Sequence, residues 1–418
     1  MSGASALQGV RVIELASERC AFAGKLLADM GADVVLVEPP GGDPSRHYAP
    51  FAGDRPDPER SLYFWHYQTS KRGITLDLEK EPGRAILSRL IEAADLVLEA
   101  EPPGRLEALG LDGAARCESQ PGLIWVSLTP FGQHGPRRDE QVTDLTLLAG
   151  GGPVWSCGYD DHSIPPVRGS GNQAYHIAGH YAVLSALTAY LHRLAGGEGQ
   201  YVDLNMHAAA NVTTEMASYH WLVQKGTVQR QTGRHAMETI TMETQTECAD
   251  GRHASTGVPP RTPREFQNLY EWIVELGYEE AFPESVFLKM GGERESIDLS
   301  QIGQDDEVTA MFAAGRDAMD FIARRVPAFD FFKGAQDRGM AVGVVYSPEE
   351  AFEDEHFQAR GFPVEVEHPE LGRTVTYPGA PYRFEKTPWR IQRRAPLLGE
   401  HTREVLREAG LDPEADEP

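Results

Sequence analysis

The sequence is poor in cysteine and in long apolar runs. Its four cysteines lie far apart, with no C-x-x-C pair and no paired-histidine spacing, so we expect neither a metal site nor a disulfide framework. No run approaches the roughly 18 apolar residues of a membrane span. Met1 to Gln8 lack the basic and apolar regions of a signal peptide. We therefore expect a soluble, cytoplasmic protein with reduced thiols and no membrane partner.

Cations are scarce as well. The 39 lysines and arginines face 63 acidic residues, and the formal net charge is −24. A chain this acidic repels phosphate backbones, which argues against a nucleic-acid partner. An acidic ligand would depend on a local basic patch, and Lys71 with Arg72 is a candidate. A solvated basic pair is the alternative interpretation.

What the chain does contain is an alternation of apolar strands and helices. Residues 9–16 and 32–37 are apolar runs with a helical segment over 22–30 between them, which predicts a βαβ unit in a parallel sheet covered on both faces. The same alternation predicts strands over 74–78, 95–99 and 122–128 and a helix over 82–94. The first strand is followed by ERCAFAG rather than G-x-G-x-x-G, so we expect no nicotinamide or flavin cofactor.

Residues 166–203 form the stretch around which the rest of the chain is best interpreted. A turn rich in glycine and asparagine precedes Ile177, Tyr181, Leu184, Leu187 and Leu191, whose spacings of three and four predict the apolar stripe of an amphipathic helix. The exposed N–H groups and positive dipole end of its first turn favour an anion, such as a carboxylate nucleophile or a developing thioester oxygen. A helix that only packs is the alternative.

The second half of the sequence predicts a smaller domain. A long helix is expected from Asn205 to about Lys225, and helical patterns broken by charged runs follow. The predicted organisation is a large α/β domain over 1–204, a linker helix over 205–228, a small α+β domain over 229–350 and a return segment over 351–418. A helix over 348–360 and a hairpin around Glu370 to Gly372 are predicted in and near that return segment.

Several runs, in their order along the chain, resemble the family III CoA-transferases, the CaiB/BaiF group. These runs are GVRVIEL, LLADMGADVVLVEPPGGDPSR, SLYF, SKRGITLDL, ADLVLE, LIWVSLTPFGQHGP, GGEGQYVDLNMHAA and RAPLLGEHTREVL. The resemblance is weakest from about 229 to 345. It implies a Rossmann-like large domain, a smaller domain and two chains interlocked through their linkers. It also implies transfer of CoA from a thioester to a carboxylic acid through a covalent aspartyl intermediate, with acyl-CoA as substrate and no metal or redox cofactor.

The residue expected to carry that chemistry is replaced. In the family the nucleophilic aspartate lies in a pattern A-D-x-x-x-G, and here the corresponding run is AYHIAG, which places Tyr175 at the aspartate position. A phenol cannot form the acyl anhydride, and a pKa of about 10 keeps it protonated at neutral pH. The resemblance therefore implies no catalytic residue in this chain, with the neighbouring His176 as the fallback candidate.

Other family positions around the ligand also differ. Cys20-Ala21-Phe22, preceded by Glu18 and Arg19, replaces a small-residue turn beside CoA, and Ala100, Glu101 and Ala108 replace residues that touch the nucleotide. The residues that the resemblance retains for CoA are Arg46, Lys71 and Arg72. A racemase is the weaker interpretation, because Arg137-Arg138-Asp139-Glu140 lacks the expected His-Asp pair after the GQHGP turn.

Three hypotheses follow. In the first, the chain is a degenerate-site subunit of a heteromeric CoA-transferase, paired with a paralogous chain that supplies the aspartate, as in the two-subunit benzylsuccinate enzymes; alone it would form a homodimer. In the second, it is a self-sufficient enzyme on acyl-CoA that uses His176 or Glu18. In the third, it binds a CoA ester as a regulatory protein without turning it over. With Glu18, Ala100, Glu101 and Ala108 around the site, we expect this chain to bind coenzyme A weakly.

Overall fold

The computed structural model describes residues 5–257 and 259–413, which form two compact units. The first unit comprises the described residues of 1–156, 167–224 and 354–418, and the second comprises 157–166 and 225–353. The predicted small domain lies inside the second unit, which also takes in a short earlier segment. Among the described residues, no helix is both long and apolar enough to cross a membrane.

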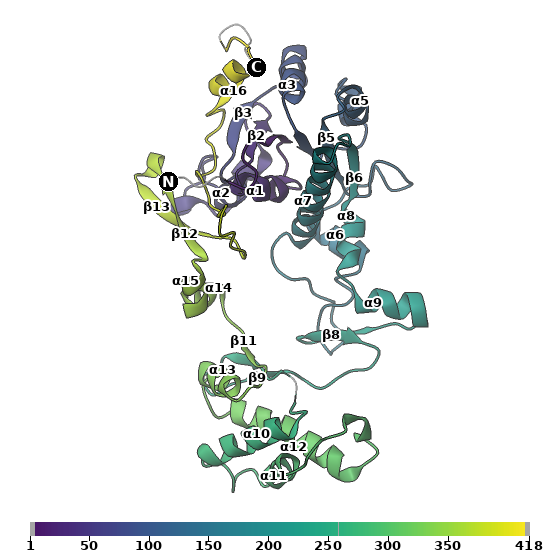
Figure 1. Cartoon of the computed structure of the whole chain (residues 1–418), viewed down its shortest axis with the longest axis vertical. Helices are drawn as coiled ribbons and strands as arrows, with labels where there is room; N and C mark the ends of the chain where they lie inside the picture. The colour runs from purple at the N-terminus through teal and green to yellow at the C-terminus, as the bar shows by residue number, and fades with distance from the viewer. Residues whose placement is uncertain (1–4, 258, 414–418) are drawn as a thin grey trace. The chain divides into compact units, whose positions relative to one another are not determined.

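A sheet of six parallel strands lies at the centre of the first unit, in the order β3-β2-β1-β4-β5-β6 (Figure 1). The strands are β1 (Arg11–Leu15), β2 (Asp33–Glu38), β3 (Arg72–Thr75), β4 (Leu96–Glu99), β5 (Ile124–Thr129) and β6 (Tyr201–Asn205). Each crossover between them contains at least one helix, which is what parallel pairing requires. The predicted α/β class and parallel sheet are confirmed.

Alternate side chains of the strands enter two separate cores. Val12 packs in the core that contains helices α1 (Ala21–Asp29) and α7 (Gln173–Leu194), whereas Ile13 packs in the core that contains α3 (Glu81–Glu92). The remaining helices of the first unit are α2 (Leu62–Tyr67), α4 (Arg105–Ala108), α5 (Gly113–Ser119), α6 (Asp144–Gly151), α8 (Met206–Val212), α9 (Met216–Tyr219), α15 (Glu355–Arg360) and α16 (Thr402–Glu408). Both faces of the sheet are therefore covered.

Helix α7 buries its small residues fully and the predicted apolar stripe only in part. A Cβ added at Gly179 would lie 3.1 Å from the Phe22 ring on α1, and the alanines of α7 are buried beside it. By contrast, Leu184 and Leu191 are 61% and 65% exposed. Small side chains let two helices approach closely, so the alanine and glycine face packs inward. Of the predicted stripe, Ile177 and Leu187 are partly buried against this core, and the rest lies on the surface.

The segment after β6 is not the single linker helix that was predicted over 205–228. Asn205 caps α8, its side chain accepting the Ala208 N–H at 3.0 Å, but α8 ends at Val212. The chain resumes helical structure in α9, which is preceded by Glu215 with a φ of 45°. A left-handed backbone at a non-glycine residue interrupts helical hydrogen bonding, so this linker is a series of short helical segments.

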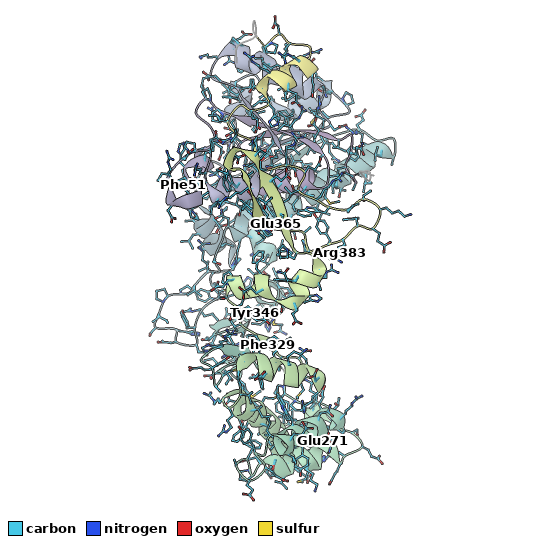
Figure 2. All side chains as sticks on the ribbon, turned by 90° about the vertical axis from the view of Figure 1, so that its left-hand side faces the viewer. Phe51, Glu271, Phe329, Tyr346, Glu365 and Arg383 are labelled. Carbon is cyan, nitrogen blue, oxygen red and sulfur yellow. The ribbon has the colours of Figure 1, made fainter. Side chains whose placement is uncertain are left out.

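The second unit is built from helices around its own core and two small antiparallel sheets, β11-β10-β9 and β7-β8. Its helices are α10 (Pro263–Glu275), α11 (Ser285–Gly292), α12 (Asp306–Ala323), α13 (Ala328–Asp337) and α14 (Pro348–Glu353), and its strands are β7 (Gln229–Gln231), β8 (Arg234–Met237), β9 (Gln245–Glu247), β10 (His253–Ser255) and β11 (Gly343–Val344). Figure 2 labels Glu271 on α10 and Phe329 on α13. The α+β class predicted for this part is confirmed.

The C-terminal segment from residue 354 belongs to the first unit. The predicted hairpin is confirmed as β12 (Pro363–His368) paired with β13 (Arg373–Pro378), and Glu365 on β12 faces the viewer in Figure 2. The helix predicted over 348–360 is divided in two at Asp354, whose side chain accepts the His356 N–H and so caps α15. Helix α16 then packs against β3.

Candidate functional site

Tyr175 lies in the first turn of α7, where the sequence places the missing aspartate, and it is 4% exposed. The N-terminus of this helix does not offer the expected anion site, because a carboxylate of the chain already occupies it. Asp144 on α6 accepts the Ala174 N–H at 2.8 Å and pairs with Arg168 at 3.2 Å. The favourable dipole end is thus used for internal capping.

The Tyr175 hydroxyl is held in its neutral form. Burial raises the pKa of Tyr175 and the Glu18 carboxylate raises it further, against a hydrogen bond from Arg19 that lowers it. Two more tyrosines of helix α2 surround the site, with Tyr63 accepting a hydrogen bond from the Asn172 amide at 2.6 Å. A neutral phenol among other phenols is a poor nucleophile toward a thioester.

His176, the fallback candidate, makes contacts both through a ring nitrogen and through the face of its ring. Its Nε2 atom lies 2.7 Å from the Tyr67 hydroxyl, and its ring stacks on Phe22 with centroids 4.1 Å apart. Burial lowers the pKa of His176, and the neighbouring His180 lowers it further. The resemblance predicts a small residue beside CoA at the position of Phe22, and here a phenyl ring packed on His176 takes that position.

Arg46 and Lys71, two of the three residues expected to bind CoA, are fully buried and paired inside the sheet layer. The Arg46 Nε lies 2.6 Å from Glu38 Oε2. The Lys71 Nζ lies 2.8 Å from Glu14 Oε1 and donates to Gln68 Oε1 at 2.6 Å. Both side chains are 0% exposed, so neither presents its charge to solvent.

Arg72, the third of these residues, joins the sheet to the C-terminal helix. Its guanidinium bonds Asp33 on β2 and both Glu404 and Glu408 on α16, all at 2.8 Å. These pairs explain how α16 is fixed to the edge strand. The three cations therefore do not form the exposed basic patch that the sequence suggested. Their binding to CoA stays a prediction, and the structure gives each of them an internal partner.

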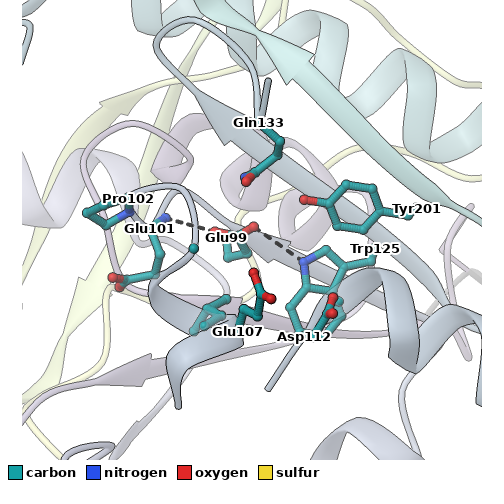
Figure 3. A pocket seen from close by; sticks show the side chains of 11 residues that line it. Glu99, Glu101, Pro102, Glu107, Asp112, Trp125, Gln133 and Tyr201 are labelled. Atoms are coloured by element: carbon teal, nitrogen blue, oxygen red, sulfur yellow. Dashed lines mark hydrogen bonds between the residues drawn. The ribbon is translucent and has the colours of Figure 1, made fainter. Parts of the chain in front are cut away.

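The carboxyl ends of β4 and β5 border an acidic cavity of about 70 Å³ (Figure 3). Four carboxyl groups line it: Glu99, Glu101, Glu107 and Asp112. Glu99 lies at its base, where it accepts hydrogen bonds from the Glu101 N–H at 2.8 Å and from Trp125 Nε1 at 3.3 Å. The stretch that the resemblance predicts to touch the nucleotide therefore places carboxyl groups along this cavity.

A second cavity of about 180 Å³ lies at the carboxyl ends of β1 and β2. Its lining includes Glu101 again and three further acidic side chains: Glu38, Asp77 and Glu79. The one arginine of the lining, Arg105, is paired with Glu79 at 2.6 Å and Glu101 at 2.8 Å. Phosphate groups placed at either cavity would meet a negative potential.

The buried Glu99 predicts a pH-dependent stability. Burial raises the pKa of Glu99 from 4.5 to about 7. Between these values the folded chain retains a proton that the unfolded chain has released, so the free energy of unfolding falls as the pH rises through this window. Glu99→Gln removes that loss, and we expect the variant to gain up to about 3 kcal/mol over the wild type between pH 5 and pH 8.

Urea unfolding at the two pH values measures this gain. Glu107→Gln removes a carboxyl group from the exposed rim of the same cavity and is the matched control. Equal changes with pH in the two variants would contradict a role for burial at Glu99.

The family model for CoA-transferase family III matches residues 7–402. The chain belongs to this family. It is 32% identical over 400 residues to the succinyl-CoA:(R)-benzylsuccinate CoA-transferase subunit BbsE of Thauera aromatica, covering 96% of this chain and 93% of that protein. It is 30% identical to the succinyl-CoA–D-citramalate CoA-transferase of Chloroflexus aurantiacus, with the same coverage of 96% and 93%.

The fold of this family III chain is also found in a solved structure. A CaiB/BaiF family protein from Brucella suis superposes with a TM-score of 0.78 at 25% identity, over 97% of this chain and 99% of that one. The predicted resemblance to family III and its fold class are thereby confirmed.

Sequence reasoning missed three parts of the site in this family III chain. Asp144 follows Thr143, which forms a capping box with Thr146. The T-D-x-T pattern therefore indicated the start of α6, but it did not indicate that Asp144 also caps α7. Tyr63 and Tyr67 are four residues apart, a spacing that places both on one helix face. The electrostatic interaction between Arg19 and Tyr175 joins residues 156 positions apart, and no local sequence pattern predicts it.

Proposed function

We propose that this chain is one subunit of a heteromeric family III CoA-transferase, and that CoA transfer takes place on the aspartate of a paralogous subunit. The observation that carries the proposal is Tyr175, a buried and neutral phenol at the position of the nucleophilic carboxylate. The filled space around Phe22 and His176 and the acidic cavities at the strand ends support weak CoA binding by this chain.

In the proposed partner, the aspartate attacks the thioester carbonyl and expels CoA, which leaves a mixed anhydride. CoA then attacks the aspartyl carbonyl of that anhydride, so the first acid leaves and an aspartyl-CoA thioester forms. The acceptor carboxylate repeats the two steps in reverse order and departs as the new CoA ester. Every step exchanges one acyl bond for another, and no electrons are gained or lost. In this proposal the present chain contributes its smaller domain, residues 229–350, to the partner's site.

Two features support an assembly of two chains. Helix α7 and the turns after it expose large apolar side chains: Leu184, Leu191, Leu194, Val212 and Tyr219. Exposed apolar surface of this kind marks association sites. The similarity to BbsE, which is named as a subunit, points the same way. A cytoplasmic location is part of the proposal, supported by four cysteines that remain thiols.

Co-expression with a paralogue that contains A-D-x-x-x-G tests the proposed function. Turnover of succinyl-CoA with a panel of carboxylic acids should appear only in the complex. Replacing the partner's motif aspartate by asparagine should abolish it, whereas Tyr175→Phe in this chain should leave turnover within about twofold, because that hydroxyl takes no part in the chemistry. A large loss of turnover from Tyr175→Phe with the complex intact would show that the site of this chain is working.

A further inference from the structure

Residues 392–402, here called the C-terminal strap, follow the edge strand β3 and lead into α16. The His401 N–H donates to the Gly73 carbonyl on β3 at 2.9 Å. A Cβ added at Gly73 would lie 2.9 Å from the Pro396 side chain, so the strap lies directly on the strand. An open strand edge exposes unpaired backbone groups to other chains, and the strap covers this edge.

The imidazole of His401 adds a second contact between the strap and β3. Its Nδ1 atom accepts the Gly73 N–H at 3.2 Å, and its Nε2 atom lies 3.2 Å from Nη1 of Arg393. A backbone N–H and a guanidinium only donate hydrogen bonds, whereas a neutral imidazole has one acceptor nitrogen and an imidazolium has none. A proton added to Nδ1 would therefore remove its bond to β3.

Charged side chains from the surrounding elements also act on His401. They are Arg72 on β3, Glu365 and Glu367 on β12, and Arg393, Arg394, Glu400 and Glu404 on the strap and α16. Burial lowers the pKa of His401 from 6.5, and Arg393 and Arg72 lower it further, against Glu400 and Glu404, which raise it. The neutral ring is thus the form that the closed strap favours.

The ring has room to leave its place. His401 is only half-buried, and a cavity of about 570 Å³ lies beside it, between the strap and β12. A protonated ring can turn into this cavity, where water accepts its hydrogen bonds. Nδ1 would then no longer hold the Gly73 N–H.

We propose that His401 is a pH-sensitive switch that holds the C-terminal strap on β3 at neutral pH and releases it on acidification. Because the proton binds more tightly to the open form, the contact is fully present above pH 6.5 and weakens as the pH falls below it. Release would open the edge of β3 and remove the Pro396 carbonyl from Arg46, which donates to it at 3.0 Å. The switch acts on the fold of this chain, whatever the role of Tyr175.

Amide hydrogen exchange of the full chain at pH 7.5 and pH 5.5 tests the switch. The protection factor of the Gly73 amide, taken against the unstructured rate at each pH, should fall about fivefold in the wild type on acidification, the equivalent of one lost hydrogen bond. The amides of the central strand β1 should stay protected at both pH values, which separates local release from global unfolding. The ion pairs of Arg72 do not confound the result, because a hydrogen bond from Arg72 lowers the pKa of Glu408 on α16.

Two variants and a control assign the effect to His401. In His401→Asn a side-chain oxygen that does not titrate replaces Nδ1 as acceptor, so Gly73 should be equally protected at both pH values. His401→Ala has no acceptor, and Gly73 should be weakly protected at both. His134→Asn changes an exposed histidine of the loop after β5 and should retain the pH dependence of the wild type.

Three results would overturn the switch. The first is unchanged protection of Gly73 in the wild type between the two pH values. The second is a folded His401→Asn variant with the pH dependence of the wild type. The third is a fall in wild-type protection centred above pH 6.5, which contradicts the direction in which burial moves the pKa of His401. The first and third need no variant, so the test stands even if a substitution prevents folding.

Discussion

Purified without a partner, this chain should transfer no measurable CoA from succinyl-CoA to any carboxylic acid. Removal of a catalytic nucleophile lowers turnover by about 10⁴- to 10⁶-fold, and Tyr175 offers a protonated hydroxyl where a carboxylate is needed. Intact-protein mass spectrometry after incubation with succinyl-CoA should detect only the unmodified chain. In the complex with an aspartate-bearing paralogue, the CoA adduct should appear on the paralogue alone.

Tyr175→Asp provides a sharper version of this experiment. The new carboxylate would lie near Arg19, whose positive charge lowers the pKa of the tyrosine, and an ion pair there would lower its nucleophilicity. Phe22 would still fill the approach to the site through its stack on His176. We therefore expect no transfer from this single substitution. CoA transfer by the Tyr175→Asp variant, or a CoA adduct on it that hydroxylamine releases, would contradict this prediction.

The strand and helix pattern of the first unit could be predicted because its signals are local. The apolar runs over 9–16 and 32–37 became β1 and β2, and the helix between them became α1. The burial of α7 could not be predicted in the same way. Periodicity identified an apolar stripe, but a second face of alanines on the same helix packs closer. Where both faces are apolar, packing distance decides which one is buried.

The chemistry of the site was predictable only where a motif carried it. Tyr175 was identified because the aspartate position is fixed by its neighbours Ala174 and Gly179. The roles of the cations were not, because their partners come from distant parts of the chain. Lys71 pairs with Glu14, 57 residues away, and Arg72 pairs with Glu404, 332 residues away. Residue type marks a cation, whereas only the fold determines whether that cation is already neutralised.

The exposed apolar face of α7 leads to the second large expected effect, which concerns assembly. Leu184 and Leu191 are both more than half exposed in the chain by itself. If a partner chain covers them, each contributes about 1.5 to 3 kcal/mol of buried apolar surface. Leu184→Glu combined with Leu191→Glu would remove that contribution and place two charges in an apolar contact, where an unpaired charge is strongly unfavourable. The lost apolar burial and the cost of two unpaired charges together are large enough to dissociate an obligate pair of chains.

We therefore expect the double variant to fold as the wild type does but to fail to co-purify with the paralogue, with loss of all transferase activity. Analytical ultracentrifugation and circular dichroism measure assembly and folding separately. Ala85→Glu, which adds the same charge to an exposed position of α3, is the matched control and should assemble normally. A double variant that still forms the active complex would show that this face of α7 is not the association surface. Two glutamates buried without partners against an apolar surface would otherwise destabilise the complex strongly.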